Sequence, residues 1–183
     1  MKAPAWTGVA VTLLICAAPL TAQVSYEQIL NAADTPENWL TYNGGYSSQR
    51  YSSLTQVTPA NVAELELKWM LQDHVFGAWQ SNPIVADGIM YITQRPNDIM
   101  AVDAVTGSVF WQYRHTNDDE TRVCCGANNR GVAILDDRVF MGALDATLLA
   151  VDRTNGKLLW ETSLADPALG YSITMPPLVV KDK

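Results

Sequence analysis

The sequence predicts an all-β protein that forms part of a β-propeller, with four antiparallel strands in each blade. Three observations support this prediction: a repeat with a fixed period, short runs of strand-forming residues in each copy, and a globular composition. Of the 183 residues, 48% are hydrophobic and 17% are charged, which excludes a disordered or collagen-like chain. The formal net charge of −7 provides no basic surface for phosphate backbones, so nucleic acid is not an expected partner.

The repeat has the pattern Ala-x-Asp-x-x-(Thr/Asn)-Gly-x-x-x-Trp. It occupies residues 101–111 and returns at residues 150–160, so its first Ala and its last Trp are both shifted by 49 positions. The same offset pairs Asp87 with Asp136 further upstream. A fixed period in this range is typical of propellers, solenoids and other repeat arrays.

The first element in chain order is a predicted secretory signal peptide at residues 1–22. One basic residue, Lys2, precedes an apolar run over residues 9–18, and the small residues Thr21 and Ala22 follow. This is the region order of a signal peptide, and the run is shorter than the roughly 20 apolar residues that span a bilayer. We therefore expect export and cleavage after Ala22, with an uncleaved anchor as the alternative.

An N-terminal segment at residues 23–60 is expected next, followed by a closing strand at about 61–72. Apolar and charged residues alternate from Leu65 to Trp69, as in a half-buried strand. In closed propellers such a strand often completes the last blade, which would require sequence that this chain does not contain. Residues 61–183 are thus predicted to be a truncated N-terminal part of a larger propeller.

The first blade is predicted at about 80–123 and the second at about 130–165. In the first copy, residues 83–86 and 89–92 form two short apolar runs joined by Asp87-Gly88, a dipeptide typical of tight hairpins. The second copy turns at Asp136-Asp137 in the same way. The start of a third blade is predicted at about 170–183, because residues 177–182 resemble the first strand and turn of the other copies.

Each copy then offers a third strand and a fourth strand that is expected to end at its Trp. These residues, Trp111 and Trp160, are large and mostly apolar, so we expect them to pack between adjacent blades. Their predicted role is therefore structural.

Two of the three cysteines, Cys124 and Cys125, are adjacent. Their Cα atoms lie about 3.8 Å apart across a trans peptide, below the usual disulfide range of about 4.4–6.8 Å. A bond between them would close a strained ring that encloses no chain loop, so it would add almost nothing to stability. From the residues alone, an exported protein either holds this pair as a disulfide that serves local shape or redox chemistry, or as two buried thiols.

Several stretches resemble the N-terminal part of the pyrroloquinoline quinone (PQQ)-dependent alcohol dehydrogenases, the methanol and ethanol dehydrogenase family of quinoproteins. Non-enzymatic propellers share the repeat, whereas the adjacent cysteines followed by Asn-Arg-Gly are specific. The residues that carry the resemblance are 39–42, 50–52, 57–62, 67–69, the two repeat copies, 124–131 and 170–174.

This resemblance implies the first blades of an eight-bladed propeller, with PQQ on its axis and a Ca²⁺ or lanthanide ion beside it. It also implies a periplasmic enzyme that oxidises a primary alcohol to an aldehyde and passes electrons to a cytochrome c-type or quinone acceptor, with membrane association of the parent protein. The alternative function is a non-catalytic exported propeller that serves as an assembly or interaction scaffold.

The resemblance assigns cofactor-binding roles to five residues. Cys124 and Cys125 would form a disulfide against one face of the quinone, Arg130 would bind a cofactor carboxylate, and Thr174 would donate its hydroxyl to another. Gln80 stands where many family members have Glu and keeps the reach and hydrogen-bonding ability of that side chain. Without the resemblance, Arg130 would be read as half of an ion pair with an Asp, and Thr174 as an ordinary strand residue.

No catalytic or metal-binding residue is assigned. The resemblance implies that the catalytic Asp and the metal ligands of the family lie further along than Lys183. The acidic run at residues 118–120 lacks the alternating spacing of a calcium loop, so we expect a solvated loop there. The two histidines, His74 and His115, are too few for a His-rich zinc site.

Overall fold

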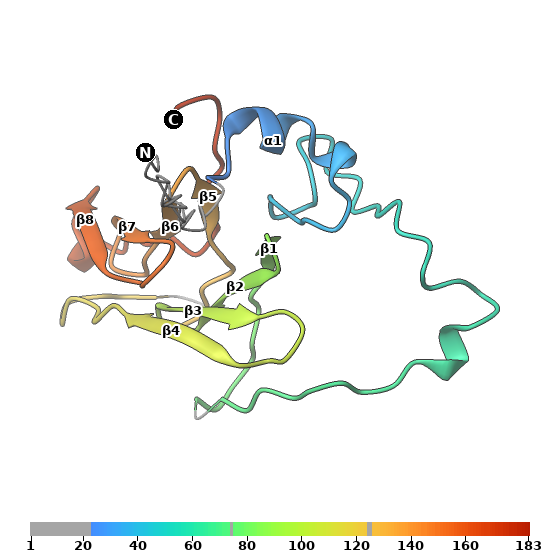
Figure 1. Ribbon diagram of the computed structural model, residues 1–183. Helices are drawn as coiled ribbons and strands as arrows, with labels where there is room; N and C mark the ends of the chain where they lie inside the picture. The colour runs from blue at the N-terminus through green and yellow to red at the C-terminus, as the bar shows by residue number, and fades with distance from the viewer. Residues whose placement is uncertain (1–22, 74, 124–125) are drawn as a thin grey trace, which may run out of the picture.

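The computed structural model describes residues 23–73, 75–123 and 126–183. Its main feature is a pair of four-stranded antiparallel sheets, with strand orders β1-β2-β3-β4 and β5-β6-β7-β8 (Figure 1). Each sheet corresponds to one copy of the repeat, which confirms the all-β prediction and a partial propeller with four antiparallel strands per blade. The strands are β1 Ile84–Ala86, β2 Ile89–Gln94, β3 Asp98–Asp103, β4 Val109–Arg114, β5 Ala133–Leu135, β6 Arg138–Gly142, β7 Thr147–Asp152 and β8 Leu158–Ser163.

Strand pairing repeats with the offset seen in the sequence. Ile84 faces Tyr91 in the first sheet, as Ala133 faces Phe140 in the second. Both sheets also have a bulge between their third and fourth strands, directly after the Ala of the repeat pattern. The repeat therefore sets the register of both blades.

Both predicted hairpins are present. Asp87 and Asp136 each begin the turn with a left-handed φ of 53°. Asp tolerates this conformation better than most residues, because its short polar side chain can bond to the nearby backbone. The turn residues of the two copies thus explain why β2 folds back on β1 and β6 on β5.

The prediction that the fourth strand ends at its Trp is wrong. β4 continues past Trp111 to Arg114, and β8 continues past Trp160 to Ser163. The third strand begins early enough to supply partners for these additional residues, since Asp98 pairs with Arg114 and the first residue of β7 with the last of β8. Ladder pairing, and not the position of the aromatic side chain, decides where the strand ends.

Trp111 packs between the two blades, as the sequence predicts. Its ring lies against Gly156 of the second blade, where a Cβ atom would come within 2.5 Å of the ring. Its Nε1 donates a hydrogen bond of 3.0 Å to the carbonyl oxygen of Arg153. Trp69 lies against the corresponding Gly107 of the first blade and donates to a carbonyl oxygen there. The turn glycine of each blade therefore receives the Trp that precedes that blade.

Arg153 is the polar part of this interface. Its side chain is buried, and its Nε donates to the hydroxyl of Tyr91 at 2.9 Å. Its Nη2 donates to the Asp87 carboxylate at 2.6 Å, so a turn of the second blade is tied to the hairpin of the first.

The outermost strand of the second blade, β8, is exposed along its length. The ring of Trp160 contacts that of Phe140 in its own blade in a tilted arrangement, with 6.0 Å between ring centroids and 49° between ring planes. The packing of Trp160 against a further blade stays a prediction.

The N-terminal segment contains the helix α1 (Tyr26–Leu30) and the 3-10 turn η1 (Ala32–Asp34). Isolated bridges join Val24 to Asp136 and Trp39 to Val85, so this segment lies across the hairpin of the second blade and the first strand of the first. Ile29 is buried in the same core.

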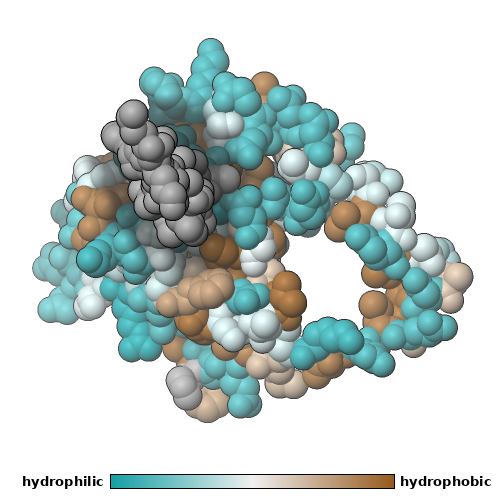
Figure 2. Space-filling view, viewed as in Figure 1, coloured by the Kyte–Doolittle hydropathy of each residue, from teal (hydrophilic) through white to brown (hydrophobic). Residues whose placement is uncertain are grey.

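Residues 50–68 form an arc that stands away from the blades around an opening, and the chain returns to the first blade at Trp69 (Figures 1 and 2). The arc contains the 3-10 turn η2 (Val62–Glu64) and no assigned strand. Because residues 61–72 pair with no strand in the described part of the chain, the closing strand stays a prediction.

The predicted third copy begins after the 3-10 turn η3 (Pro167–Leu169). Lys181 has a φ of 58°, close to that of the first turn residue in the other two hairpins, and Val180 and Lys183 exchange backbone hydrogen bonds. Val179 is buried, and its carbonyl oxygen accepts a hydrogen bond from the hydroxyl of Tyr46. The third copy thus repeats the turn geometry, although residues 170–183 contain no assigned strand.

The predicted signal peptide, residues 1–22, lies outside the described residues. Within the described part of the chain, no helix has the length and apolar character needed to cross a bilayer.

Candidate functional site

Three connecting segments, which lead into β1, into β5 and into the start of the third copy, meet beside one another. The backbone N–H of Asn82 donates to the carbonyl oxygen of Arg130 at 3.1 Å. The backbone N–H of Arg130 in turn donates to the carbonyl oxygen of Thr174 at 3.1 Å. Gln80 lies two residues before Asn82. The fold therefore brings Arg130 and Thr174 into direct backbone contact and links the segment of Gln80 to them, although about 45 residues of chain separate successive segments.

Arg130 is partly buried, and its guanidinium makes a single long hydrogen bond, from Nη1 to the carbonyl oxygen of Thr174 at 3.4 Å. Among the described residues, no carboxylate pairs with it. The ion pair with an Asp that the residue type alone suggested is therefore absent from this part of the chain. Most of the guanidinium donors remain for another acceptor.

Thr174 is partly buried and Gln80 is exposed. Neither side chain forms a hydrogen bond with another described residue. Together with Arg130, they offer a cation, a hydroxyl and an amide, with no carboxylate among them. This set of groups can donate several hydrogen bonds to an anionic acceptor.

Cys124 and Cys125 lie outside the described residues, so their predicted disulfide stays a prediction. The chain on both sides of them is held by specific contacts. Upstream, the loop after β4 is fixed by a polar cluster, and downstream, residues 126–131 are fixed by Asn129 and Arg95.

Asn129 is a site residue that the sequence reasoning missed. Its buried side chain donates from Nδ2 to the carbonyl oxygen of Gly142 at 2.8 Å and accepts from the N–H of Gly131 at 3.1 Å. Its own carbonyl oxygen accepts from the hydroxyl of Thr93 at 3.2 Å. These contacts fix the backbone on both sides of Arg130. The resemblance included Asn129 in its Asn-Arg-Gly motif but assigned it no role, since nothing local indicates a partner in β6.

Asn128 contributes a different feature. It is buried, and its Oδ1 has no hydrogen-bond partner among the described residues. A buried polar atom normally has a partner, so this Oδ1 is available to accept a further hydrogen bond.

The segment of Thr174 is held by close packing on β6. Gly142 has no Cβ, and the position of that missing atom lies 2.2 Å from Cγ2 of Ile173. The backbone N–H of Ile173 donates to the carbonyl oxygen of Ala143 at 3.1 Å. The glycine is therefore required for Thr174 to approach the second blade.

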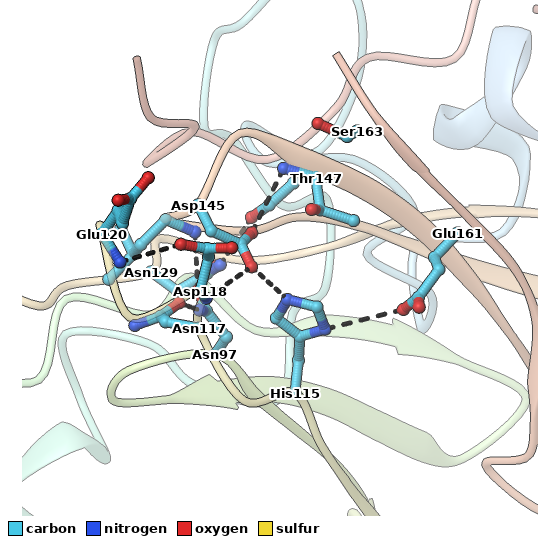
Figure 3. Close-up of polar contacts among 12 residues, drawn as sticks. Asn97, His115, Asn117, Asp118, Glu120, Asn129, Asp145, Thr147, Glu161 and Ser163 are labelled. Atoms are coloured by element: carbon cyan, nitrogen blue, oxygen red, sulfur yellow. Dashed lines mark hydrogen bonds and ion pairs between the residues drawn. The ribbon is translucent and has the colours of Figure 1, made fainter. Parts of the chain in front are cut away.

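The polar cluster upstream of the cysteines is centred on Asp145 (Figure 3). His115 Nε2 lies 2.7 Å from Oδ2 of Asp145, and its Nδ1 lies 3.8 Å from a carboxylate oxygen of Glu161. The N–H groups of Asp118 and Thr147 donate to the Asp145 carboxylate at 3.3 and 3.2 Å. The turn between β6 and β7 thus holds the loop that leads to the cysteines.

A second anchor of this loop comes from the turn between β2 and β3. The side chain of Asn97 donates to the side chain of Asn117 and accepts from the N–H of Leu144 at 3.0 Å. Because Asn97 is fully buried, it joins both blades to the loop at once.

Burial raises the pKa of the Asp145 carboxyl, but the hydrogen bond and charge of His115, with further bonds from Thr147 and the Asp118 backbone, hold the pKa below its ordinary value. A carboxyl whose pKa is lower in the folded protein contributes stability above its unfolded pKa of about 4, and this contribution is lost as the pH falls through the lowered value. The cluster is therefore expected to weaken in acid.

Replacing Asp145 by Asn tests this. We expect Asp145→Asn to lower the free energy of unfolding near neutral pH by about 1–3 kcal/mol, because buried donors lose their charged acceptor. We also expect the variant to lose less stability than the wild type below about pH 4. Urea unfolding at a series of pH values measures both effects, with Asp119→Asn in the exposed part of the loop as control. If the free energy of unfolding fell equally steeply below about pH 4 in the wild type and in Asp145→Asn, the lowered pKa of Asp145 would be contradicted.

The described residues contain no group of three or more His, Cys, Asp or Glu that could hold a metal ion. Residues 118–120 are exposed, and the Asp118 carboxylate accepts from the N–H of Glu120 at 2.8 Å. This supports the predicted solvated loop.

Comparison with known proteins adds to this geometry. The family model described as "PQQ: Glucose/ethanol/alcohol dehydrogenase, beta-propeller domain" matches residues 39–166. A quinoprotein ethanol dehydrogenase of Pseudomonas aeruginosa is 39% identical over 175 residues, which cover 94% of this chain and 28% of that protein. The 1-butanol dehydrogenase (quinone) of Thauera butanivorans is 37% identical over 179 residues, which cover 95% of this chain and 28% of that protein.

Two solved structures are also similar. The quinohemoprotein alcohol dehydrogenase ADHIIG from Pseudomonas putida HK5 has a TM-score of 0.83 at 36% identity, covering 89% of this chain and 24% of that one. A europium-containing methanol dehydrogenase has a TM-score of 0.80 at 32% identity, covering 85% of this chain and 28% of that one. The chain thus spans about 28% of the length of the two curated relatives above.

Proposed function

The chain belongs to the glucose/ethanol/alcohol dehydrogenase β-propeller family of PQQ proteins, and we propose that its protein oxidises a primary alcohol to an aldehyde with PQQ and a bound metal ion. In this proposal the reaction takes place in the periplasm, and the electrons pass to a cytochrome c-type or quinone acceptor. PQQ, when bound, supplies the quinone that accepts two electrons from the alcohol.

The observation that carries the proposal is the guanidinium of Arg130 beside Thr174, which has no carboxylate partner among the described residues. PQQ is a flat o-quinone with three carboxylates, and the donor set of Arg130, Thr174 and Gln80 contains no competing negative charge. The residues therefore fit the cofactor. Arg130 would bind one carboxylate through charge-assisted hydrogen bonds, and the Thr174 hydroxyl would donate to another.

Gln80 would contribute differently from the Glu of many family members. Its amide retains an acceptor, adds two donors and carries no charge. Opposite a tricarboxylate, a neutral amide avoids the repulsion that a carboxylate would add. Gln80 is therefore proposed as a hydrogen-bonding residue of the cofactor site.

The metal is proposed as Ca²⁺ or a lanthanide. A europium-containing methanol dehydrogenase is among the similar structures, which supports the lanthanide alternative. Because the described residues offer no metal-binding group, the ligands are proposed to come from outside the described part of the chain.

The remaining parts of the proposal rest on other observations. Export to the periplasm rests on the predicted signal peptide at residues 1–22, and the cytochrome-type acceptor on similarity to quinohemoprotein alcohol dehydrogenases. A non-catalytic scaffold remains the competing function, but it gives no reason for a partly buried arginine that lacks a carboxylate partner in the described part of the chain.

The adjacent cysteines provide the test of this function. The full-length protein, reconstituted with PQQ and Ca²⁺ or a lanthanide, is expected to oxidise a primary alcohol with an artificial electron acceptor. The double variant Cys124→Ser, Cys125→Ser should lose about 2- to 12-fold of this turnover, because the quinone loses a polarizable face worth about 0.3–1.5 kcal/mol.

Circular dichroism of the double variant serves as the folding control. Undiminished turnover in the folded double variant would remove the cysteines from the site. Failure of the wild type both to bind PQQ and to oxidise any primary alcohol would instead contradict the function itself and favour the scaffold.

A further inference from the structure

Arg95 joins the two segments that carry Gln80 and Arg130. It directly follows β2, its Nε donates to the carbonyl oxygen of Ala127 at 3.0 Å, and its Nη1 donates to that of Phe76 at 3.2 Å. Ala127 lies three residues before Arg130, and Phe76 lies four residues before Gln80. One planar guanidinium thus fixes two stretches of main chain at a defined separation.

Gly77 leaves room for this guanidinium because it has no side chain. It has a φ of +126°, and the position where a Cβ atom would lie is only 1.6 Å from Nη1 of Arg95 and 2.9 Å from its Cζ. Any side chain at this position would displace Arg95 from its place. The two residues therefore depend on each other, although 18 positions separate them.

The charge of Arg95 has no counterpart in the part of the chain that the structure describes. Among the described residues, no carboxylate forms an ion pair with it, although its side chain is partly buried. Its Nη2 lies 3.8 Å from the Cβ position of Gly126. A partly buried cation without an anion costs free energy, and that cost is reduced if an anionic ligand binds nearby.

The same end of β2 holds the Gln80 segment at further points. The Nε1 of Trp79 donates to the carbonyl oxygen of Thr93 at 2.7 Å, and the N–H of Thr93 donates to the hydroxyl of Ser81 at 2.8 Å. Gln80 therefore lies between two residues that are anchored on β2. Arg95 is the contact that extends this anchoring to the loop of Arg130.

We propose that Arg95 is a positioning residue of the cofactor site, which holds the Gln80 segment and the Arg130 loop in the arrangement that accepts PQQ and adds positive charge beside it. This role rests on the proposed function. It requires no contact between Arg95 and the cofactor.

The test uses the full-length protein without cofactor, titrated with PQQ. Quenching of Trp fluorescence gives the dissociation constant, and the absorption spectrum of bound PQQ reports its surroundings. Removal of the outer partners of metal ligands typically weakens metal binding about 10- to 100-fold. By analogy, we expect Arg95→Gln to raise the dissociation constant of PQQ about 10-fold and to shift the spectrum. Arg95→Lys should fall between this variant and the wild type, because one ammonium keeps the charge but loses the fork.

Gly77→Ala is the second variant, and it leaves Arg95 in the chain. Its new Cβ should displace the guanidinium and weaken PQQ binding to a similar extent. The double variant Arg95→Gln, Gly77→Ala should bind no more weakly than the weaker of the two single variants, because both changes break one contact. Gly88→Ala is the matched control, since Gly88 also has a positive φ, of +77°, but lies in open space, and Arg138→Gln controls for loss of one positive charge.

The outcomes separate the two hypotheses. PQQ binding that is unchanged in Arg95→Gln and Gly77→Ala would overturn the role of Arg95 while leaving the proposed function intact, and so would a lower melting temperature with an unchanged dissociation constant. If Arg95→Gln does not fold, Arg95→Lys and Gly77→Ala decide in the same way. A wild-type protein that binds no PQQ would overturn both.

Discussion

Replacing Arg130 by Gln is expected to weaken PQQ uptake by the full-length apoprotein roughly 100-fold. Truncating one partner of a buried, hydrogen-bonded charge pair typically costs about 2–5 kcal/mol, and about 2.8 kcal/mol corresponds to a 100-fold change. The guanidinium of Arg130 has only one long contact within the described chain, at 3.4 Å, so nearly all of its donors are available to the cofactor. Equilibrium titration with PQQ measures the effect.

Two variants make this result interpretable. Arg130→Lys keeps the charge but cannot donate two parallel hydrogen bonds, so an intermediate loss of about 10-fold is expected. Arg138→Gln removes a charge from β6, where it pairs with Asp137 at 3.7 Å, and should leave uptake unchanged. The backbone bond from Arg130 to Thr174 persists in every variant, so folding should be retained. Uptake by Arg130→Gln within 2-fold of wild type would exclude a carboxylate contact, given that one such bond is worth about 1.5 kcal/mol or more.

Trp111→Ala is expected to have the largest effect on stability, a loss of about 3–5 kcal/mol in the free energy of unfolding. The indole fills the space between the blades against Gly156, donates to the carbonyl oxygen of Arg153 and lies 6.0 Å from the ring of Tyr91, centroid to centroid. Removing it leaves a cavity and an unpaired carbonyl oxygen. Denaturant unfolding of the full-length protein measures the loss.

Trp111→Phe and Gly156→Ala separate packing from hydrogen bonding. Trp111→Phe keeps most of the ring but loses the Nε1–H donor, so a cost of about 1 kcal/mol is expected. Gly156→Ala places a Cβ within 2.5 Å of the indole and should cost more than Gly88→Ala, which meets no neighbour. The excess should disappear in the Trp111→Ala background, because the clash needs both groups. An undiminished excess in that background would mean that the indole does not pack on Gly156.

The sequence predicted the blades because their signals are local and repeated. The dipeptide Asp87-Gly88 and its counterpart at Asp136 mark hairpins within a few residues, and the Trp of the repeat marks a large apolar surface that must be covered. The structure confirmed these elements and the place of Trp111. The end of the fourth strand was predicted wrongly because it depends on the length of the neighbouring third strand, which no signal within the fourth strand encodes.

The candidate site was predicted only in part. Resemblance to a family singled out Gln80, Arg130 and Thr174, and the structure places their three segments side by side. The resemblance assigned no role to Arg95 or Asn129, because their partners lie on other strands or in another loop. Similarly, nothing in the chain around His115 indicates Asp145, which lies on the next blade.

By itself, the sequence determined the repeat, the turns, the strand content and the family, since these follow from residue types at short or regular spacings. Only the tertiary structure decided that Gly77 makes room for Arg95, that Asp145 holds the loop before the cysteines, and that Arg130 is left without a carboxylate partner in the described chain. These contacts join residues from different blades and loops. The physical reason is that a side chain's partner is set by how the sheets pack, and the packing of one blade on the next is not visible in the periodicity of either.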